Sequence, residues 1–274
     1  GGPMSSADFA YILFSEFLTQ DPDDTEWIAR DRFVLSAGHE SMLLYALLFL
    51  SGRLSLKDLK EFRQLHSKTP GHPEVEISGV EATTGPLGQG VCMATGMALA
   101  EVILCNLFEK NGSDLLSHFT YVLASDGDIQ EPVTLGAASL AGHWRLKKLI
   151  MFYDSNEAQI SGKTHRSEST DIPIIFEGIG WHVQEIDGHD HQEIRKAIQK
   201  AQIIDRPSII VGKTTMANGL STMEGDHNTH GAPLPQDEID ATKEKLGLPA
   251  ESFFIPEEVQ SHFQKNFQRL KEKI

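Results

Sequence analysis

The spacing of hydrophobic residues in the first part of the chain predicts helices. Four segments have this spacing: residues 5–18, 41–50, 55–64 and 89–109. The first is amphipathic, with Ser5 or Ser6 as a candidate N-cap, and Ser55 opens the third. The second is apolar on all sides, as in a buried helix, and the fourth is rich in small residues that allow close packing.

After residue 118 the pattern changes to short apolar runs separated by helical stretches. The runs that predict strands are 119–124, 148–153, 181–186 and 208–211. Helices are predicted over 134–142 and 191–204. Strands that alternate with helices form βαβ units around a buried parallel sheet. We therefore predict an α/β fold, a three-layer sandwich around a mostly parallel sheet.

The rest of the chain divides into a loop and a tail. Residues 66–90 are rich in Gly, Pro, Thr and Ser, which predicts a loop, and long loops in compact domains usually carry function. The tail is polar and helical. We expect one domain over residues 1–235 and a helical extension over 236–274.

The charge balance narrows the classes of partner. The chain has 24 basic and 39 acidic residues, a formal net charge of −15, which opposes binding to nucleic acid or to an anionic membrane. The longest uninterrupted apolar run has nine residues, Met42 to Leu50, far below the roughly 20 that span a bilayer. Two cysteines give no disulfide framework. We expect a cytoplasmic protein, and the net charge still allows a small anionic ligand, because one local site can oppose it.

Polar residues follow three of the predicted strands. They are Asp126-Gly127-Asp128, Asp154-Ser155-Asn156 and Asp187-Gly188-His189. Ligands of parallel sheets bind at the carboxyl ends of the strands, and carboxylate and amide oxygens suit Mg²⁺ or Ca²⁺. Because Mg²⁺ often shares its shell with phosphate, a phosphorylated cofactor fits. The alternative is that these acids are ordinary turn and N-cap residues.

A glycine-rich segment and four histidines are further candidates. Thr83 to Gly90 enters the long helix, where backbone amides favour phosphate, but it matches neither a Walker nor a Rossmann pattern; a tightly packed helix entry is the alternative. The histidines in loops are His39, His72, His227 and His230. They suit proton transfer or phosphate binding, or are structural. We expect structural roles for His66, His118, His143, His165, His182, His189, His191 and His262.

Together these segments resemble the transketolases, which use thiamine diphosphate to move two-carbon ketol units between sugar phosphates. The matching segments are Pro3-Met4, Ala7-Asp8, Asp31 to Ser36, Gly38-His39, Phe62 to Glu74, Gly79 to Glu81, Thr83 to Gly90, Ser139 to Gly142 and Gly231 to Leu234. The diphosphate-binding signature of the wider superfamily is matched by Asp126-Gly127 with Asn156. The resemblance implies the thiamine diphosphate-binding fold.

The resemblance also implies roles for single residues. Asp126, Asn156 and the carbonyl of Ala158 would hold Mg²⁺, or Ca²⁺ as a substitute, together with the cofactor diphosphate. The remaining implied residues are Gly127 against the diphosphate, Gly85 and Leu87 around the cofactor, His39 and His230 toward the diphosphate or substrate, His72 near the donor sugar, and Glu131 in an acidic network between two active sites of a dimer. Three positions depart from the family pattern: Ser125, Glu157 and Glu40.

A whole transketolase continues into a pyrimidine-binding domain, which this sequence does not contain. We therefore expect the N-terminal, pyrophosphate-binding subunit of a split transketolase, active with a C-terminal partner subunit in an α2β2 heterotetramer, or else a truncated chain. The alternatives are a related two-carbon transferase acting on an unusual sugar or a carrier-bound acceptor, and a non-catalytic subunit of the same fold. A Mg²⁺-dependent phosphohydrolase is less well supported, because no nucleophile or second metal cluster is evident.

Overall fold

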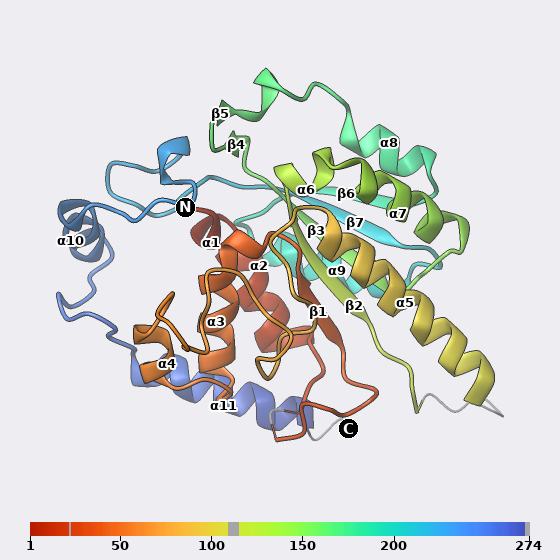
Figure 1. Ribbon diagram of the computed structural model, residues 1–274, viewed down its shortest axis with the longest axis horizontal. Coiled ribbons are helices and arrows are strands. Elements are labelled where there is room, and N and C mark those ends of the chain that lie inside the picture. Colours follow the sequence, from red (N-terminus) through yellow and green to blue (C-terminus); the bar gives the residue numbers. More distant parts are fainter. Residues whose placement is uncertain (22, 109–114, 272–274) are drawn as a thin grey trace.

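The fold is built on a five-stranded sheet in which every strand is parallel to its neighbours. The computed structural model describes residues 1–21, 23–108 and 115–271. The strands of this sheet are β1 (Arg32–Leu35), β2 (Thr120–Ser125), β3 (Leu149–Ser155), β6 (His182–Asp187) and β7 (Ser208–Lys213). Their order is β1-β2-β3-β7-β6, so β7 lies between β3 and β6. All carboxyl ends therefore lie at one edge (Figure 1).

Alternating side chains along the strands supply two separate apolar cores. Phe33, Tyr121 and Phe152 face one core, where Phe9 stacks on Phe152 with ring centroids 4.0 Å apart. Their neighbours Val34 and Val122 face the other core. This alternation is the period of a strand buried on both faces. The predicted three-layer α/β arrangement is confirmed.

Helices cover both faces of the sheet (Figure 1). The first face is covered by α2 (Ala7–Ile12), the π-helical turn η1 (Leu13–Phe17), α3 (Ser41–Leu50), α4 (Leu56–Lys60), α9 (His191–Ile203) and α11 (Glu257–Lys271). The second face is covered by α5 (Gln89–Phe108), α6 (Asp126–Gln130), α7 (Pro132–His143) and α8 (Ile172–Gly178). Further elements are α1 (Gly2–Ser5), α10 (Gln236–Lys245), the two-stranded ribbon β4 (Ala158–Gln159) and β5 (Gly162–Lys163), and the short 3-10 helices Gly38–Glu40, Thr164–Arg166 and His227–Thr229.

The first predicted helix differs most from the structure. The segment 5–18 is divided: α1 ends at Ser5, α2 begins at Ala7, and the last turn is π-helical. Neither serine caps the helix through its side chain, because the Ser5 hydroxyl donates to Asp154 and the Ser6 hydroxyl to Glu40. These hydroxyls bind buried carboxyl groups near the edge of the sheet instead.

The other predicted elements agree closely, with differences at their ends. Ser55 caps α4 in a reciprocal capping box, but α4 ends at Lys60 because the chain then turns through Arg63 at φ 61°. Residue 109, at the end of the fourth predicted helix, lies outside the described residues. The sequence pattern does not predict β1, in which only three apolar residues follow a charged one. It also misses α6, α8 and the ribbon.

Helix α5 has the length and composition of a membrane-spanning helix. It nevertheless packs against α7 and three strands, and its Glu101 is buried in an ion pair with Lys148, with Oε1 and Nζ 2.6 Å apart. A single helix of this kind is weak evidence for a membrane, since core helices of soluble proteins share its composition. Helix α5 thus packs on the sheet and on α7 along one side, and only 28% of its apolar window is buried.

Candidate active site

A cavity of about 320 Å³ opens at the carboxyl ends of β1, β2 and β3. These strands are neighbours, so the segments that follow them meet at one place. The cavity is lined by His39, Glu40, Leu87, Ser125, Asp126, Gly127, Gln130, Glu131, Asn156, Ala158, Gln159, Ile160, Ser161 and His230. It contains eight of the ten residues that the sequence nominated. The two others, His72 and Gly85, are outside this lining.

His72 and Gly85 lie next to each other on the loop between α4 and α5. A Cβ added to Gly85, whose φ is +153°, would be 3.2 Å from Cγ of His72. Gly85 also approaches Gly38, where an added Cβ would be 2.7 Å from the Gly85 amide nitrogen. Gly38 precedes His39, so this close approach connects the loop to the cavity wall. His72 is exposed to solvent.

Asp126 is a buried carboxylate with one unused oxygen. The Tyr153 hydroxyl donates to its Oδ1 at 2.7 Å, while Oδ2 is buried with no hydrogen-bond partner. Burial raises the pKa of Asp126 to about 6, and the Tyr153 hydrogen bond opposes that rise. A buried acceptor without a donor is costly unless a ligand completes it. Asp126 is therefore suited to bind a cation.

Asn156 is held in a fixed orientation beside Asp126. Its Nδ2 donates to Oδ2 of Asp154 at 2.8 Å, and its Oδ1 accepts from the amide of Ala158 at 3.0 Å. Asp154 is fully buried and also accepts from the hydroxyls of Ser5 and Thr214. Asp154 is thus a positioning residue for Asn156, a role that its place after a strand did not reveal.

The oxygen ligands fit a hard cation that is completed by a second group. Among residues 1–21, 23–108 and 115–271, no set of three His, Cys, Asp or Glu side chains gathers as a metal cluster. One carboxylate, one amide oxygen and a carbonyl would suit Mg²⁺ only together with phosphate oxygens or water. The unpartnered Oδ2 of Asp126 agrees with such a shared site.

Two stacked imidazoles also line the cavity. The ring centroids of His39 and His230 are 4.9 Å apart, with an interplanar angle of 24°. His39 Nε2 and His230 Nδ1 are buried without a partner. Burial, followed by the influence of His230 and His72, lowers the pKa of His39 to about 4; burial also lowers the pKa of His230. Both rings are neutral at pH 7, so each can offer a hydrogen bond to a ligand.

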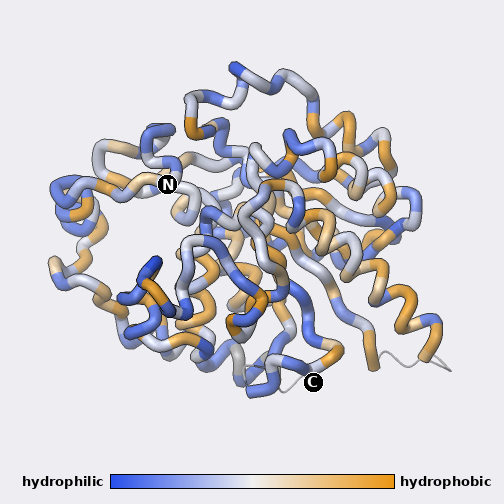
Figure 2. Tube along the Cα trace, in the orientation of Figure 1, coloured by the Kyte–Doolittle hydropathy of each residue, from blue (hydrophilic) through white to orange (hydrophobic). Residues whose placement is uncertain are grey.

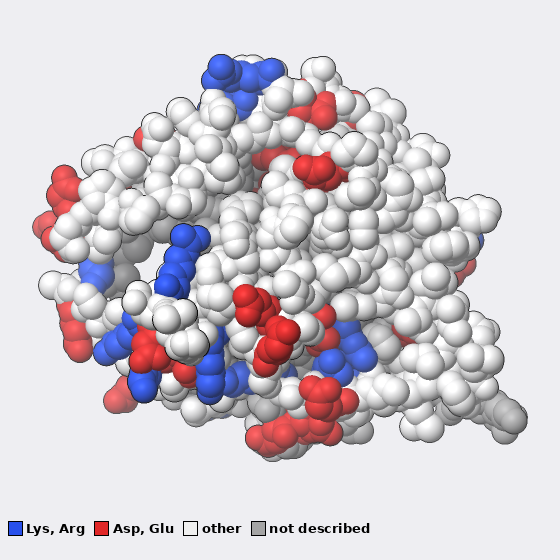
Figure 3. All heavy atoms as spheres, in the orientation of Figure 1, with Lys and Arg blue, Asp and Glu red and all other residues white. Residues whose placement is uncertain are grey.

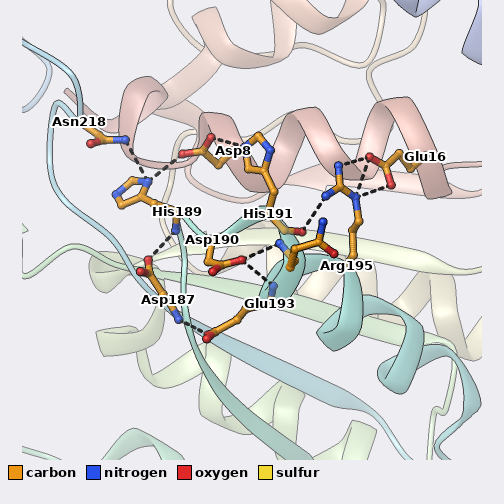
Figure 4. Close-up of polar contacts among 10 residues, drawn as sticks. Asp8, Glu16, Asp187, His189, Asp190, His191, Glu193, Arg195 and Asn218 are labelled. Carbon is orange, nitrogen blue, oxygen red and sulfur yellow. Dashed lines mark hydrogen bonds and ion pairs between the residues drawn. The ribbon is translucent and has the colours of Figure 1, made fainter.

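A polar network outside the cavity joins α2 to the segment that follows β7 (Figure 4). His189 Nδ1 lies 2.8 Å from Asp8 Oδ2, and the amide of Thr215 donates to His189 Nε2 at 2.9 Å. His191 Nε2 is 2.8 Å from the other oxygen of Asp8. These contacts join α2 to the segment that follows β7. His189 and His191 are hydrogen-bonded structural residues, as expected.

The three departures from the family pattern have different structural settings. Ser125 caps α6 in a reciprocal box with Asp128, at φ −107°, a conformation open to any residue. Glu157 has φ 57°, where a residue with a Cβ is strained by about 1–2 kcal/mol, which explains why glycine suits this position. Glu40 is buried, and burial, then the charge of Asp154, raises the pKa of its carboxyl well above the usual value.

The family model described as "Transketolase, thiamine diphosphate binding domain" matches residues 1–274. A transketolase of Halalkalibacterium halodurans is 48% identical over 277 residues, covering 100% of this chain and 42% of that protein. Transketolase 1 of Escherichia coli is 47% identical over 263 residues, covering 94% of this chain and 40% of that protein.

The solved structures to which this chain is similar are also transketolases. The transketolase of Leishmania mexicana superposes with a TM-score of 0.97 at 40% identity, covering 100% of this chain and 42% of that one. The transketolase of Campylobacter jejuni has a TM-score of 0.93 at 44% identity, covering 100% and 44%. The chain thus spans about two fifths of the length of the relatives it matches.

Proposed function

This chain belongs to the transketolase family, and we propose that it supplies the cofactor-binding half of an active site that transfers a two-carbon ketol unit from a ketose phosphate to an aldose phosphate. The observation that carries the proposal is the cavity itself. Four residues of its lining have a buried polar atom without a partner: Oδ2 of Asp126, Nε2 of His39, Nδ1 of His230 and Nε2 of Gln130. A ligand with anionic oxygens and a bound cation would complete all four.

The residues fit thiamine diphosphate with Mg²⁺. Asp126 and Asn156, with the carbonyl of Ala158, would hold the metal, and Gly127 would lie against the diphosphate. The thiazolium of the cofactor supplies the electron sink for breaking and forming the C–C bond. This chain's own contribution is to bind and orient, and its neutral imidazoles His39 and His230 would donate hydrogen bonds to phosphate or sugar oxygens.

His72 and Glu131 have more exposed positions. His72 lies on the solvent side of Gly85, where a sugar could reach it from outside the cavity. Glu131 lines the cavity and is also exposed, just before α7. We propose the donor sugar as the ligand of His72 and an acidic contact with another subunit for Glu131.

An exposed apolar face on α5 and α7 supports the proposal that this chain binds a partner polypeptide. Helices α5 and α7 lie side by side, and large apolar side chains on both are exposed: Ile103, Leu107, Val133, Leu140 and the following Trp144. Figure 3 shows this face almost without charged side chains, and Figure 2 shows the end of α5 as strongly apolar. Exposed patches of this kind mark interaction sites. We propose that the pyrimidine-binding part of the enzyme, as a C-terminal subunit in an α2β2 assembly, covers it.

The decisive experiment combines this chain with the partner polypeptide. Binding of thiamine diphosphate with Mg²⁺ is measured by calorimetry, and turnover is measured with xylulose 5-phosphate and ribose 5-phosphate. Asp126→Ala should abolish cofactor binding because it removes the only charged ligand proposed for the metal. Asp171→Ala, which changes an exposed N-cap of α8, is the matched control and should bind normally.

Two results would lead to different conclusions. If the wild-type pair binds no cofactor, the chain is a non-catalytic subunit of this fold. If it binds the cofactor but does not turn over this sugar pair, it is a two-carbon transferase with another sugar or a carrier-bound acceptor.

A further inference from the structure

Asp128 is a fully buried carboxylate just below the candidate active site. It is the third residue of α6, directly after Asp126 and Gly127, and its exposed fraction is 0%. It is not part of the cavity lining. A carboxylate kept out of water in this way must be compensated by hydrogen-bond donors or by charge.

The donors to Asp128 come from three separate segments. Its Oδ1 accepts from the Ser36 hydroxyl at 2.6 Å and from the Gly88 amide at 2.7 Å. Its Oδ2 accepts from the amide and the hydroxyl of Ser125 at 2.9 and 3.1 Å. Ser36 follows β1, Ser125 ends β2, and Gly88 precedes α5. One carboxylate therefore joins two strand ends to the glycine-rich loop.

The joined segments form one wall of the cavity. Leu87 precedes Gly88 and packs on Gly127, where an added Cβ would be 2.6 Å from Leu87 Cδ1. Leu87, Ser125, Asp126 and Gly127 all line the cavity. The spacing between the loop and the turn at Gly127 is thus set by the hydrogen bonds of Asp128.

We propose that Asp128 is a positioning residue for the diphosphate of the cofactor, which it serves by fastening the glycine-rich loop to the Asp126–Gly127 turn. The inference rests on the proposed function. Asp128 does not touch the ligand; it acts through Gly88, Leu87 and Ser125. Outer partners of this kind change ligand affinity roughly 10- to 100-fold when they are removed.

The role requires an acceptor at both oxygens. Asn has the same shape as Asp, but its NH₂ group would face either the Gly88 amide or the Ser125 amide, donor against donor. Asp128→Asn should therefore displace the loop or the turn. Ser36→Ala removes one donor and leaves the carboxylate in place, so it is a milder variant.

The test uses the complex with the partner subunit, freed of cofactor and then titrated with thiamine diphosphate in excess Mg²⁺. We expect Asp128→Asn to raise the cofactor Kd at least about tenfold, with kcat at saturating cofactor within about threefold of wild type. Hydrogen exchange at the Gly88 amide, measured without cofactor, should become faster. A merely structural residue would lower the melting temperature without this split between Kd and kcat.

Asp31→Asn is the matched control. Asp31 is also buried and accepts two backbone amides, those of Thr19 and Phe119, but at the opposite edge of the sheet. It should lower the melting temperature and leave the cofactor Kd unchanged. If Asp128→Asn does not fold, Ser36→Ala must still raise Kd by about threefold or more.

The outcomes separate the two proposals. If wild type binds the cofactor and the Asp128 and Ser36 variants bind it equally well, the positioning role is wrong while the proposed function stands. If wild type itself does not bind the cofactor, both are wrong.

Discussion

Single residues in this protein show how burial changes acid chemistry. Glu40 follows His39, lines the cavity and is 1% exposed. Its pKa is raised by burial and by the charge of Asp154, whereas the Ser6 hydroxyl opposes that rise. Its carboxyl group is therefore protonated in the folded state at pH values where the unfolded chain has already lost that proton.

This difference predicts a pH effect on stability. Above pH about 4.5 the unfolded Glu40 ionises and the folded one does not, so wild-type stability falls by up to about 1.4 kcal/mol per pH unit until the folded pKa is reached. The glutamine side chain of the Glu40→Gln variant cannot ionise, so the stability of this variant does not fall in this way as pH rises. Denaturant unfolding between pH 5 and 8 should therefore show Glu40→Gln gaining on wild type as pH rises. Parallel stability curves would contradict the prediction.

Position after a strand pointed to only part of the candidate site, and the family resemblance supplied the other residues. Asp126 and Asn156 follow apolar runs, so their meeting at one edge follows from a parallel sheet. The contact between Asp128 and Ser125 could have been predicted from the sequence, because the two residues have the spacing of a capping box. Its contacts with Ser36 and Gly88 join segments far apart in the sequence, and no local pattern predicts them.

At the scale of elements, glycines allow a helix to pack directly against the backbone of a neighbouring segment. Gly142, near the end of α7, faces the backbone before β6, and a Cβ there would be 1.8 Å from the carbonyl oxygen of Ile179. This distance allows no side chain without moving backbone. Gly136 lies on the same helix, with nothing within 4 Å of its added Cβ.

These two glycines form a matched pair. Gly142→Ala should reduce the free energy of unfolding by about 3 kcal/mol or more, because either α7 or the Ile179 segment must shift. Gly136→Ala should raise it by about 0.5–1 kcal/mol, the helix propensity difference. Urea unfolding of both variants measures the two effects. Equal effects of the same sign would show that helix propensity alone determines them.

The elements with regular periodicity were predictable, and the irregular ones were not. Helix α5 and strands β2 and β3 agree with their apolar patterns. The division between α1 and α2 was hidden, because the Ser5 and Ser6 hydroxyls bind Asp154 and Glu40 rather than the helix end. The partners of these two hydroxyls are set by tertiary contacts, which the local sequence does not show.

At the scale of the whole molecule, the exposed face of α5 and α7 predicts assembly. Leu140 is 48% exposed on this face, and Leu246, at the end of α10, is 52% exposed elsewhere. Leu140→Asp should weaken association with the partner subunit at least about tenfold, since a charge would be buried in the interface. Leu246→Asp is the control and should associate normally. Sedimentation of the mixed subunits measures both, and equal association of both variants would exclude this face as the interface.

The order of the strands in the sheet could not be predicted from the spacing of hydrophobic residues. Local patterns indicate which runs are strands, but not that β7 separates β3 from β6. The parallel arrangement followed from the alternation of strands and helices, whereas the order depends on which edges the connecting helices cover.

That order has a consequence for biosynthesis. Strand β6 leaves the ribosome before β7, yet β7 must enter between it and β3. Translation proceeds at about 5–20 residues per second, so β7 is synthesised several seconds after β3. During that interval one edge of the largely apolar strand β3 lacks its hydrogen-bonding neighbour, while β2 is available to pair with the other edge. Chaperone binding during translation should therefore be concentrated between the emergence of residue 155 and that of residue 213.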